Sequence, residues 1–176
     1  MYMNEVQYKQ ILIEVILMQL SIKKLVYSAL MIAIVFVSTM AIAIPLPFGY
    51  VNLGDGAIYI ASAILGPKLG FLAGAIGSSL ADYSLSYVIY VIPTFFIKGA
   101  MGLISGIFFQ KNKPLPGLLL SVVVLVLGYY ITEIILTGNL IAPLSSIPFN
   151  LSQGLIGAAV GLLFYRKFHG KSFFTK

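Results

Sequence analysis

Four ionisable residues lie inside or at the edge of long apolar stretches: Asp55, Asp82, Lys98 and Glu133. Charged side chains at membrane depth are costly, and they usually face a partner charge, a ligand or a water-filled cavity. Lys98 is the deepest of the four, with Asp82 and Glu133 as candidate counter-charges; its ammonium could instead point into a pocket and contact a ligand. Asp55 begins an apolar segment, where a carboxylate interacts favourably with the helix macrodipole.

The composition places these residues in a lipid bilayer. Of the 176 residues, 60% are hydrophobic and 9% are charged, and the mean hydropathy is +1.02, whereas a soluble domain carries about 25% charged residues. The chain has no Cys and one His, and it has no G-x-x-x-x-G-K-[ST] motif, which leaves no basis for a thiolate metal site, a His-dependent triad or a P-loop. We therefore predict no enzyme activity, no cofactor and no metal. The net charge of +6 comes from scattered residues, so nucleic acid is not an expected partner.

Six apolar segments must position the polar residues. They cover residues 25–44, 54–65, 69–83, 88–109, 115–136 and 147–165. A helix needs about 20 apolar residues to cross a bilayer, so the second segment is too short, and the loop before it must dip inward or fold over the bundle. In the third segment small residues recur every four positions, as at Gly70, Gly74 and Ser78, which lets helix backbones approach closely in lipid.

The loop charges predict the topology. Lys and Arg occur before the first segment, in the loops after the second and fourth, and after the sixth, and the other three loops contain none. Since cytoplasmic loops are rich in Lys and Arg, we predict an all-α membrane protein of six transmembrane helices with both termini in the cytoplasm. Residues 23–168 would form this domain and 169–176 a basic tail. Residues 1–22 would be an extension, either an amphipathic interfacial helix along Ile11, Val15 and Met18 or a run from an upstream start ahead of Met18.

With this topology, polar side chains converge at the outer ends of the segments. The candidate binding residues are Asn52, Asp82, Tyr87, Tyr90, Thr94, Lys98, Glu133, Asn150 and Gln153. Spacings of three and four residues put Tyr87, Tyr90, Thr94 and Lys98 on one helix face. The set predicts a cup that opens outward above a tightly packed base. Other interpretations stay open: Tyr87 and Tyr90 also suit an interfacial aromatic belt, Asp82 also suits a helix end at the water interface, and Asn150 with Gln153 also suits a bridge between helices.

Several stretches together resemble a known family over residues 19–166. They are Ala29-x-x-x-Ala33, YVNLGDGAIYIASAILGPKLGFLAGAIGSSLAD, Pro93-Thr94-x-x-Ile97-Lys98-Gly99-x-Met101-Gly102 and Pro148-Phe149-Asn150-x-x-Gln153-Gly154. The chain resembles the substrate-binding S components of energy-coupling factor (ECF) vitamin transporters. The resemblance implies six helices, a vitamin bound in an outward cup, and assembly with a membrane scaffold subunit and two cytoplasmic ATPases. It also implies a gating loop with Pro45, Pro47, Phe48, Gly49 and Tyr50, and a partner-docking face with Ala29 and Ala33.

The leading hypothesis is therefore a vitamin-capture subunit in a bacterial plasma membrane, which binds a small molecule and catalyses nothing. The sequence is most similar to the hydroxymethylpyrimidine/pyridoxine type, with the pantothenate and riboflavin types close behind. Because the chain has no Trp, Tyr and Phe would have to stack on a heteroaromatic ring. One alternative is a stand-alone proton-coupled carrier with Asp82, Lys98 and Glu133 as a relay. Another is a purely structural subunit, which predicts no small ligand.

Overall fold

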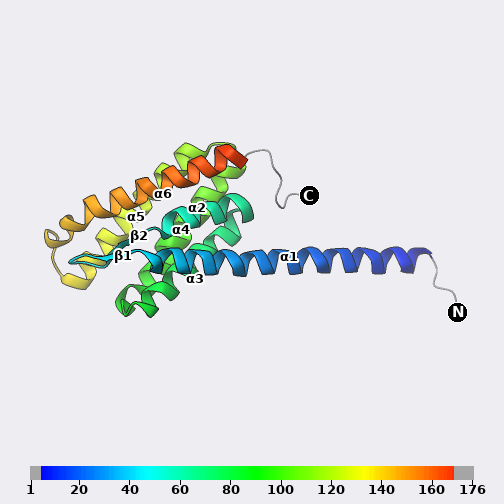
Figure 1. The fold of residues 1–176 in the computed structure, drawn as a ribbon, viewed down its shortest axis with the longest axis horizontal. Coiled ribbons are helices and arrows are strands. Elements are labelled where there is room, and N and C mark those ends of the chain that lie inside the picture. The colour runs from blue at the N-terminus through cyan, green and yellow to red at the C-terminus, as the bar shows by residue number, and fades with distance from the viewer. Residues whose placement is uncertain (1–4, 169–176) are drawn as a thin grey trace.

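The computed structural model describes residues 5–168, with side chains from residue 21 onward, and within this part six α-helices form one bundle (Figure 1). The helices are α1 (Glu5–Ala41), α2 (Gly54–Leu65), α3 (Pro67–Ser84), α4 (Val91–Gln110), α5 (Pro114–Thr137) and α6 (Ile147–Phe168). Two short 3₁₀-helices, η1 (Val88–Tyr90) and η2 (Ala142–Ser146), precede α4 and α6. The predicted amphipathic face at residues 11–18 and the basic tail 169–176 lie outside the residues whose side chains are described.

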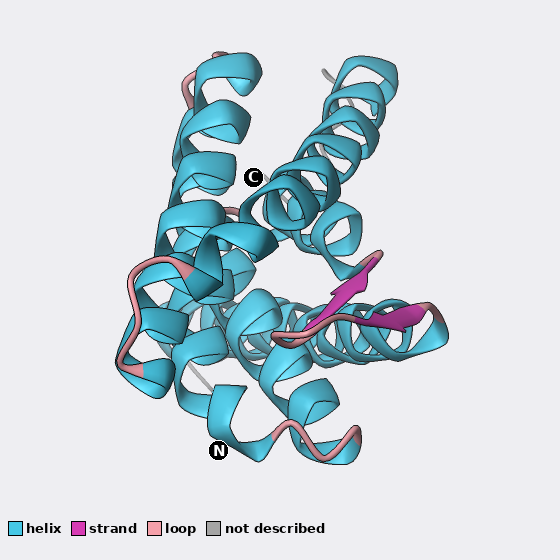
Figure 2. Ribbon diagram, turned by 90° about the vertical axis from the view of Figure 1, so that its left-hand side faces the viewer, coloured by secondary structure: helices cyan, strands magenta, loops and turns pink. Residues whose placement is uncertain are grey.

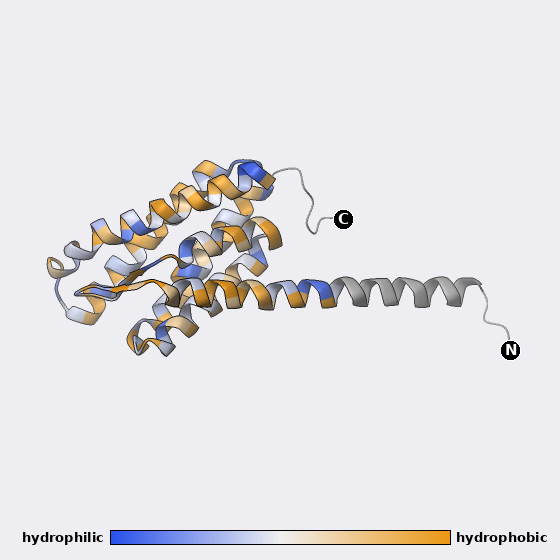
Figure 3. Ribbon diagram, in the orientation of Figure 1, coloured by the Kyte–Doolittle hydropathy of each residue, from blue (hydrophilic) through white to orange (hydrophobic). Residues whose placement is uncertain are grey.

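Four stretches within the described residues are long and apolar enough to cross a membrane by length and composition. They are Ser21–Ala41, Val88–Gln110, Pro114–Thr137 and Ala142–Phe168. The helix α2 has 12 residues and is short, as the sequence predicts. The helix α3 has 18 residues, but its glycines and serines lower its hydropathy (Figure 3). The six predicted segments are therefore all helical, while four have the length and composition of full spans.

Glycines let α3 pack tightly against α4. A Cβ atom on Gly102 of α4 would stand 2.2 Å from the carbonyl oxygen of Gly70 in α3. A Cβ atom on Gly74 would stand 2.4 Å from the carbonyl oxygen of Lys98. These distances are far below van der Waals contact, so only glycine fits at these two crossings. The predicted packing role of the small residues is confirmed, and it sets the position of Lys98 relative to α3.

The first loop contains a short β-hairpin, where the sequence predicted only a loop in an all-α protein. Strand β1 (Ala43–Pro45) pairs antiparallel with β2 (Tyr50–Asn52). Pro45 and Pro47 prevent continuation of the helix, and Gly49 adopts a φ of +68° in the turn, a conformation that glycine reaches without steric cost. The hairpin brings the chain back toward the bundle axis before α2 begins.

The two ends of the bundle differ in charge. The hairpin, the α3–α4 connection and the α5–α6 connection lie at one end, and the α2–α3 turn, the α4–α5 turn and the C-terminal end of α6 lie at the other (Figure 1). The second end carries the basic residues Lys68, Lys111, Lys113, Arg166 and Lys167. Figure 2 looks onto the hairpin end and shows the two strands beside the helix ends. The charge pattern of the loops thus corresponds to two physical ends of the molecule.

Candidate functional site

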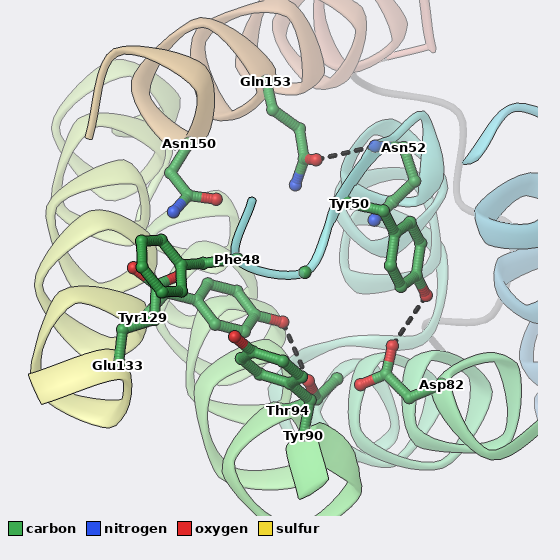
Figure 4. Close-up of a pocket in the computed structure, with 11 residues that line it drawn as sticks. Phe48, Tyr50, Asn52, Asp82, Tyr90, Thr94, Tyr129, Glu133, Asn150 and Gln153 are labelled. Carbon is green, nitrogen blue, oxygen red and sulfur yellow. Dashed lines mark hydrogen bonds between the residues drawn. The ribbon is translucent and has the colours of Figure 1, made fainter. Parts of the chain in front are cut away.

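A pocket lies at the hairpin end, enclosed by side chains from the hairpin and from α3 to α6 (Figure 4). Its lining residues are Phe48, Gly49, Tyr50, Asn52, Asp82, Tyr90, Thr94, Tyr129, Glu133, Asn150 and Gln153. All the predicted binding residues except Tyr87 and Lys98 are in this set. From the predicted gating loop Phe48, Gly49 and Tyr50 reach the pocket, whereas Pro45 and Pro47 do not line it. The structure therefore brings together residues separated by up to 105 positions in the sequence.

The hairpin leaves little space in this pocket. The cavity has a volume of about 20 Å³, which is room for about one water molecule. A heteroaromatic ring cannot enter such a space unless side chains or the hairpin itself move. Binding of a heteroaromatic ring here therefore requires movement of lining side chains such as Phe48 and Tyr50 or of the hairpin.

Asp82 and Tyr50 connect the hairpin to α3. The Tyr50 hydroxyl donates to Asp82 Oδ1 at 2.6 Å. Burial, followed by the nearby Asp82 carboxylate, raises the pKa of Tyr50 well above its usual value, so its hydroxyl keeps the proton that it donates. The Tyr50 ring also packs against Tyr87, with ring centroids 4.8 Å apart. Tyr87 therefore supports the hairpin from behind instead of lining the pocket.

Asp82 is 4% exposed, and its second carboxylate oxygen, Oδ2, has no hydrogen-bond partner among the described residues. The sequence left open whether this carboxylate ends a helix at the water interface or belongs to a pocket. The structure buries it in the pocket wall. A buried acceptor without a donor is costly, which makes Oδ2 the most conspicuous unsatisfied atom in this site.

Lys98 forms an ion pair with Asp55 beneath the pocket. Its Nζ atom bonds Asp55 Oδ1, and the two side chains are 2% and 1% exposed. This corrects the expectation that Asp82 or Glu133 would be the counter-charge. Asp55 does lie in the first turn of α2, as predicted, but the hairpin carries that turn inward beside α4. Sequence spacing could not reveal this, because the depth at which α2 begins depends on the fold of the loop before it.

Gln153 joins the ion pair to the hairpin. Its Nε2 group donates to Asp55 Oδ2 at 2.9 Å, and its Oε1 atom accepts from the backbone N–H of Asn52 at 2.7 Å. Asn52 in turn accepts from the backbone N–H of Gly54 at 2.9 Å. Gln153 therefore both lines the pocket and bridges helices, two roles that were alternative interpretations of the sequence. Displacement of β2 would break its bond to this amide.

The far wall of the pocket is aromatic and acidic. Tyr129 forms a hydrogen bond of 2.9 Å with Thr94, and its ring centroid is 6.3 Å from that of Tyr90. Glu133 is 2% exposed and accepts a hydrogen bond from Ser146 in η2. Tyr129 was missing from the predicted set, although its position one helical turn before Glu133 puts both on the same face. This wall could stack on a heteroaromatic ring and accept its hydrogen bonds.

The predicted docking residues face away from the bundle. Ala29 and Ala33 on α1 are exposed, whereas Ser28, Val35 and Thr39 on the same helix are buried. The small-residue face is thus left uncovered by the rest of this chain. Close packing of another helix on it would be sterically possible.

A family model described as an ECF-type riboflavin transporter, S component, matches residues 19–169. The chain belongs to the ECF S-component family. Members of this family are integral membrane proteins that bind small-molecule substrates and couple to a scaffold and to ATPase subunits, and they are not enzymes. The ECF S-component fold positions the pocket and hairpin described above.

Individual relatives and solved structures are also similar to this chain. An uncharacterised protein encoded in the region 3′ of the gap gene of Pyrococcus woesei is 38% identical over 110 residues, which are 59% of this chain and 74% of the relative. A solved bacterial ECF S component has a TM-score of 0.67 at 22% identity, covering 84% of this chain and 95% of that chain. An S component for biotin has a TM-score of 0.60 at 21% identity, covering 87% and 94%. At these identities the two structures support the fold and leave the substrate of this chain open.

Proposed function

We propose that this S component captures a small heteroaromatic vitamin or precursor of the hydroxymethylpyrimidine/pyridoxine class at the outer face of the cell membrane. Uptake would be driven by two cytoplasmic ATPases through a membrane scaffold subunit. The observation that carries the proposal is the pocket itself, which combines aromatic rings with hydrogen-bond acceptors and is lined on one side by a hairpin. A single ring demands the least displacement of Phe48 and Tyr50.

The charge of the two ends supports an outward orientation of the pocket. The pocket lies at the hairpin end, and the Lys and Arg residues of the turns lie at the opposite end. The positive-inside rule puts that opposite end in the cytoplasm. Six spans with cytoplasmic termini then follow, with the short α2 mostly buried and in contact with α1, α3, α4 and α6.

This orientation predicts a labelling pattern. A single Cys at Lys111, which is exposed in the α4–α5 turn, should react with a membrane-impermeant maleimide only after the cells are opened. A single Cys at Leu140, which is 66% exposed between α5 and α6, should react in intact cells. The parent chain has no Cys and serves as the blank. The reverse pattern would contradict both the topology and the outward pocket.

Riboflavin is the second candidate, because the matching family model is described by that vitamin. Its three fused rings would require a larger displacement of the hairpin than a pyrimidine or pyridine does. The proton-coupled carrier is less well supported, since Lys98 pairs with Asp55 and hydrogen-bonds to neither Asp82 nor Glu133. The relay suggested by the sequence is therefore not continuous in the structure.

Native mass spectrometry of the purified protein followed by calorimetric titration tests the substrate. We expect a co-purified or added pyridoxine or hydroxymethylpyrimidine to bind, with riboflavin and pantothenate binding at least tenfold more weakly. Preferential binding of riboflavin would replace the first candidate by the second. The absence of binding by all four compounds would favour the purely structural subunit.

A further inference from the structure

The pocket contains two buried acids and no basic side chain among its described lining residues. Asp82 is 4% exposed and Glu133 is 2% exposed. Lys98 is nearby, but its ammonium is engaged by Asp55, so its charge is already compensated. A ligand carboxylate in this pocket would meet two buried acids with no free cation to offset them, which is unfavourable in a medium of low dielectric constant.

One carboxylate oxygen is placed to accept a hydrogen bond from a ligand. Asp82 Oδ1 is occupied by the Tyr50 hydroxyl, while Oδ2 has no partner among the described residues. Figure 4 shows Oδ2 on the side of the carboxylate that faces Thr94 and Tyr90. The Thr94 hydroxyl is bonded to Tyr129 at 2.9 Å. Thr94 also interacts with the Asp82 carboxylate, but no described group completes a hydrogen bond to Oδ2, and a bound ring lying against Tyr90 could supply that donor.

We infer that Asp82 Oδ2 accepts a hydrogen bond from an N–H group of the ligand and so determines the specificity of the pocket. The ligand class is a heteroaromatic ring with a ring N–H, an exocyclic amine or a protonated nitrogen, and carboxylate-bearing ligands are rejected. The inference rests on the proposed function for the location of the site. It adds the chemical group that is recognised and the residue that recognises it.

The two roles of Asp82 can be separated by substitution. Asp82→Asn introduces a side chain of nearly the same size as aspartate. Its amide oxygen can still accept from the Tyr50 hydroxyl, while its NH₂ group takes the place of Oδ2 and cannot accept a hydrogen bond from a ligand N–H. Tyr50→Phe removes the bond between hairpin and α3 but leaves the carboxylate. If Asp82 serves only to hold the hairpin, each of the two variants should change the affinity for all ligands by a similar factor. If Oδ2 recognises a donor, the loss of affinity in Asp82→Asn should be larger for ligands that carry the N–H group, and Tyr50→Phe should show no such difference.

The test measures discrimination between ligands with and without the donor, by calorimetric titration of the purified full chain in detergent. The first pair is 4-amino-5-hydroxymethyl-2-methylpyrimidine and its N,N-dimethylamino analogue, and the second is riboflavin and N3-methylriboflavin. For whichever parent compound binds, the wild type should prefer it over its methylated partner by about ten- to a hundredfold. This preference should fall to within about threefold in Asp82→Asn and persist in Tyr50→Phe, which should change the affinity for both compounds of a pair by a similar factor.

Each outcome decides the role of Asp82, the proposed function or both. A wild type that does not discriminate, an unchanged ratio in Asp82→Asn, or binding of pantothenate as tight as that of the aminopyrimidine would overturn the role of Asp82 and leave the proposed vitamin site standing. Discrimination with the riboflavin pair alone would overturn the proposed substrate class and support the role of Asp82. Failure of the wild type to bind any of these compounds would contradict the proposed function and the inference together. The ratio of the wild-type affinities for a parent compound and its methylated analogue can be measured without any variant. The inference can therefore be overturned even if Asp82→Asn folds poorly.

Discussion

Lys98→Met should lower the free energy of unfolding by about 3–5 kcal/mol, because it leaves the Asp55 carboxylate buried without its counter-charge. Both side chains are at most 2% exposed, so water cannot replace the lost partner. The loss should be visible as a large drop in the melting temperature of the purified protein in detergent. Lys68→Met is the matched control, since Lys68 is exposed in α3, and it should melt close to the wild type.

A double variant isolates the ion pair from other effects of the substitution. Lys98→Met combined with Asp55→Asn removes both charges and should recover much of the stability lost in the single variant, because no unpaired carboxylate remains. The folded fraction of Lys98→Met should bind its ligand with nearly wild-type affinity, as Lys98 does not line the pocket. A melting temperature of Lys98→Met equal to that of Lys68→Met would contradict the pairing. A ten- to hundredfold loss of affinity in stably folded protein would assign Lys98 to the binding site instead.

Replacing both Ala29 and Ala33 by Leu should abolish vitamin uptake in cells that contain the scaffold and ATPase subunits. The two alanines are exposed on α1, and a helix that packs closely on them tolerates only small side chains. Ligand affinity and melting temperature of the isolated chain should stay at wild-type values, since neither residue contacts the pocket.

The control for this docking face lies on the same helix. Leu30 and Ile34 are 50% and 39% exposed and are turned by about 100° from Ala29 and Ala33, so Leu30→Phe with Ile34→Phe enlarges a neighbouring face by a similar amount. Uptake by this variant should persist. Wild-type uptake by the Leu variant, or equal loss in both, would show that the alanines do not form the docking surface.

The hairpin connects the pocket to the core of the bundle. Its displacement must break the Tyr50–Asp82 bond and the bond from the Asn52 N–H to Gln153. The second bond ends on a side chain that also holds Asp55, the partner of Lys98. Gln153 therefore contacts both the hairpin and the buried ion pair.

The helical part of this fold was accessible from the sequence because its signals are local. Apolar runs, prolines at Pro45 and Pro47, and glycines every four residues each act over one or two turns. The predicted segments match α2 to α6 closely, whereas α1 begins at Glu5, well before the predicted first segment 25–44, and ends at Ala41. The convergence of most polar candidates on one pocket followed from the loop charges, which assign every polar residue to an end of the bundle. Position along the length of the bundle was therefore predictable for residues within regular helices.

The details that the sequence missed depend on the hairpin. The strand pairing from Ala43 to Asn52 spans only three residues on each side, too few for a periodic pattern. Because this hairpin determines where α2 starts, it also determines that Asp55 reaches Lys98. The contact of Tyr87 with Tyr50 depends on it for the same reason. Long-range partners of buried charges thus required the three-dimensional structure.

Transport by purified components in proteoliposomes tests the central claim most directly. The chain alone, reconstituted with radiolabelled ligand outside, should bind it without accumulating it, with or without a pH gradient. Together with an ECF scaffold subunit and two ATPases it should accumulate the ligand when ATP is inside the vesicles with the ATPases. Accumulation by the chain alone under a pH gradient would contradict its assignment as a capture subunit and would identify a self-sufficient carrier.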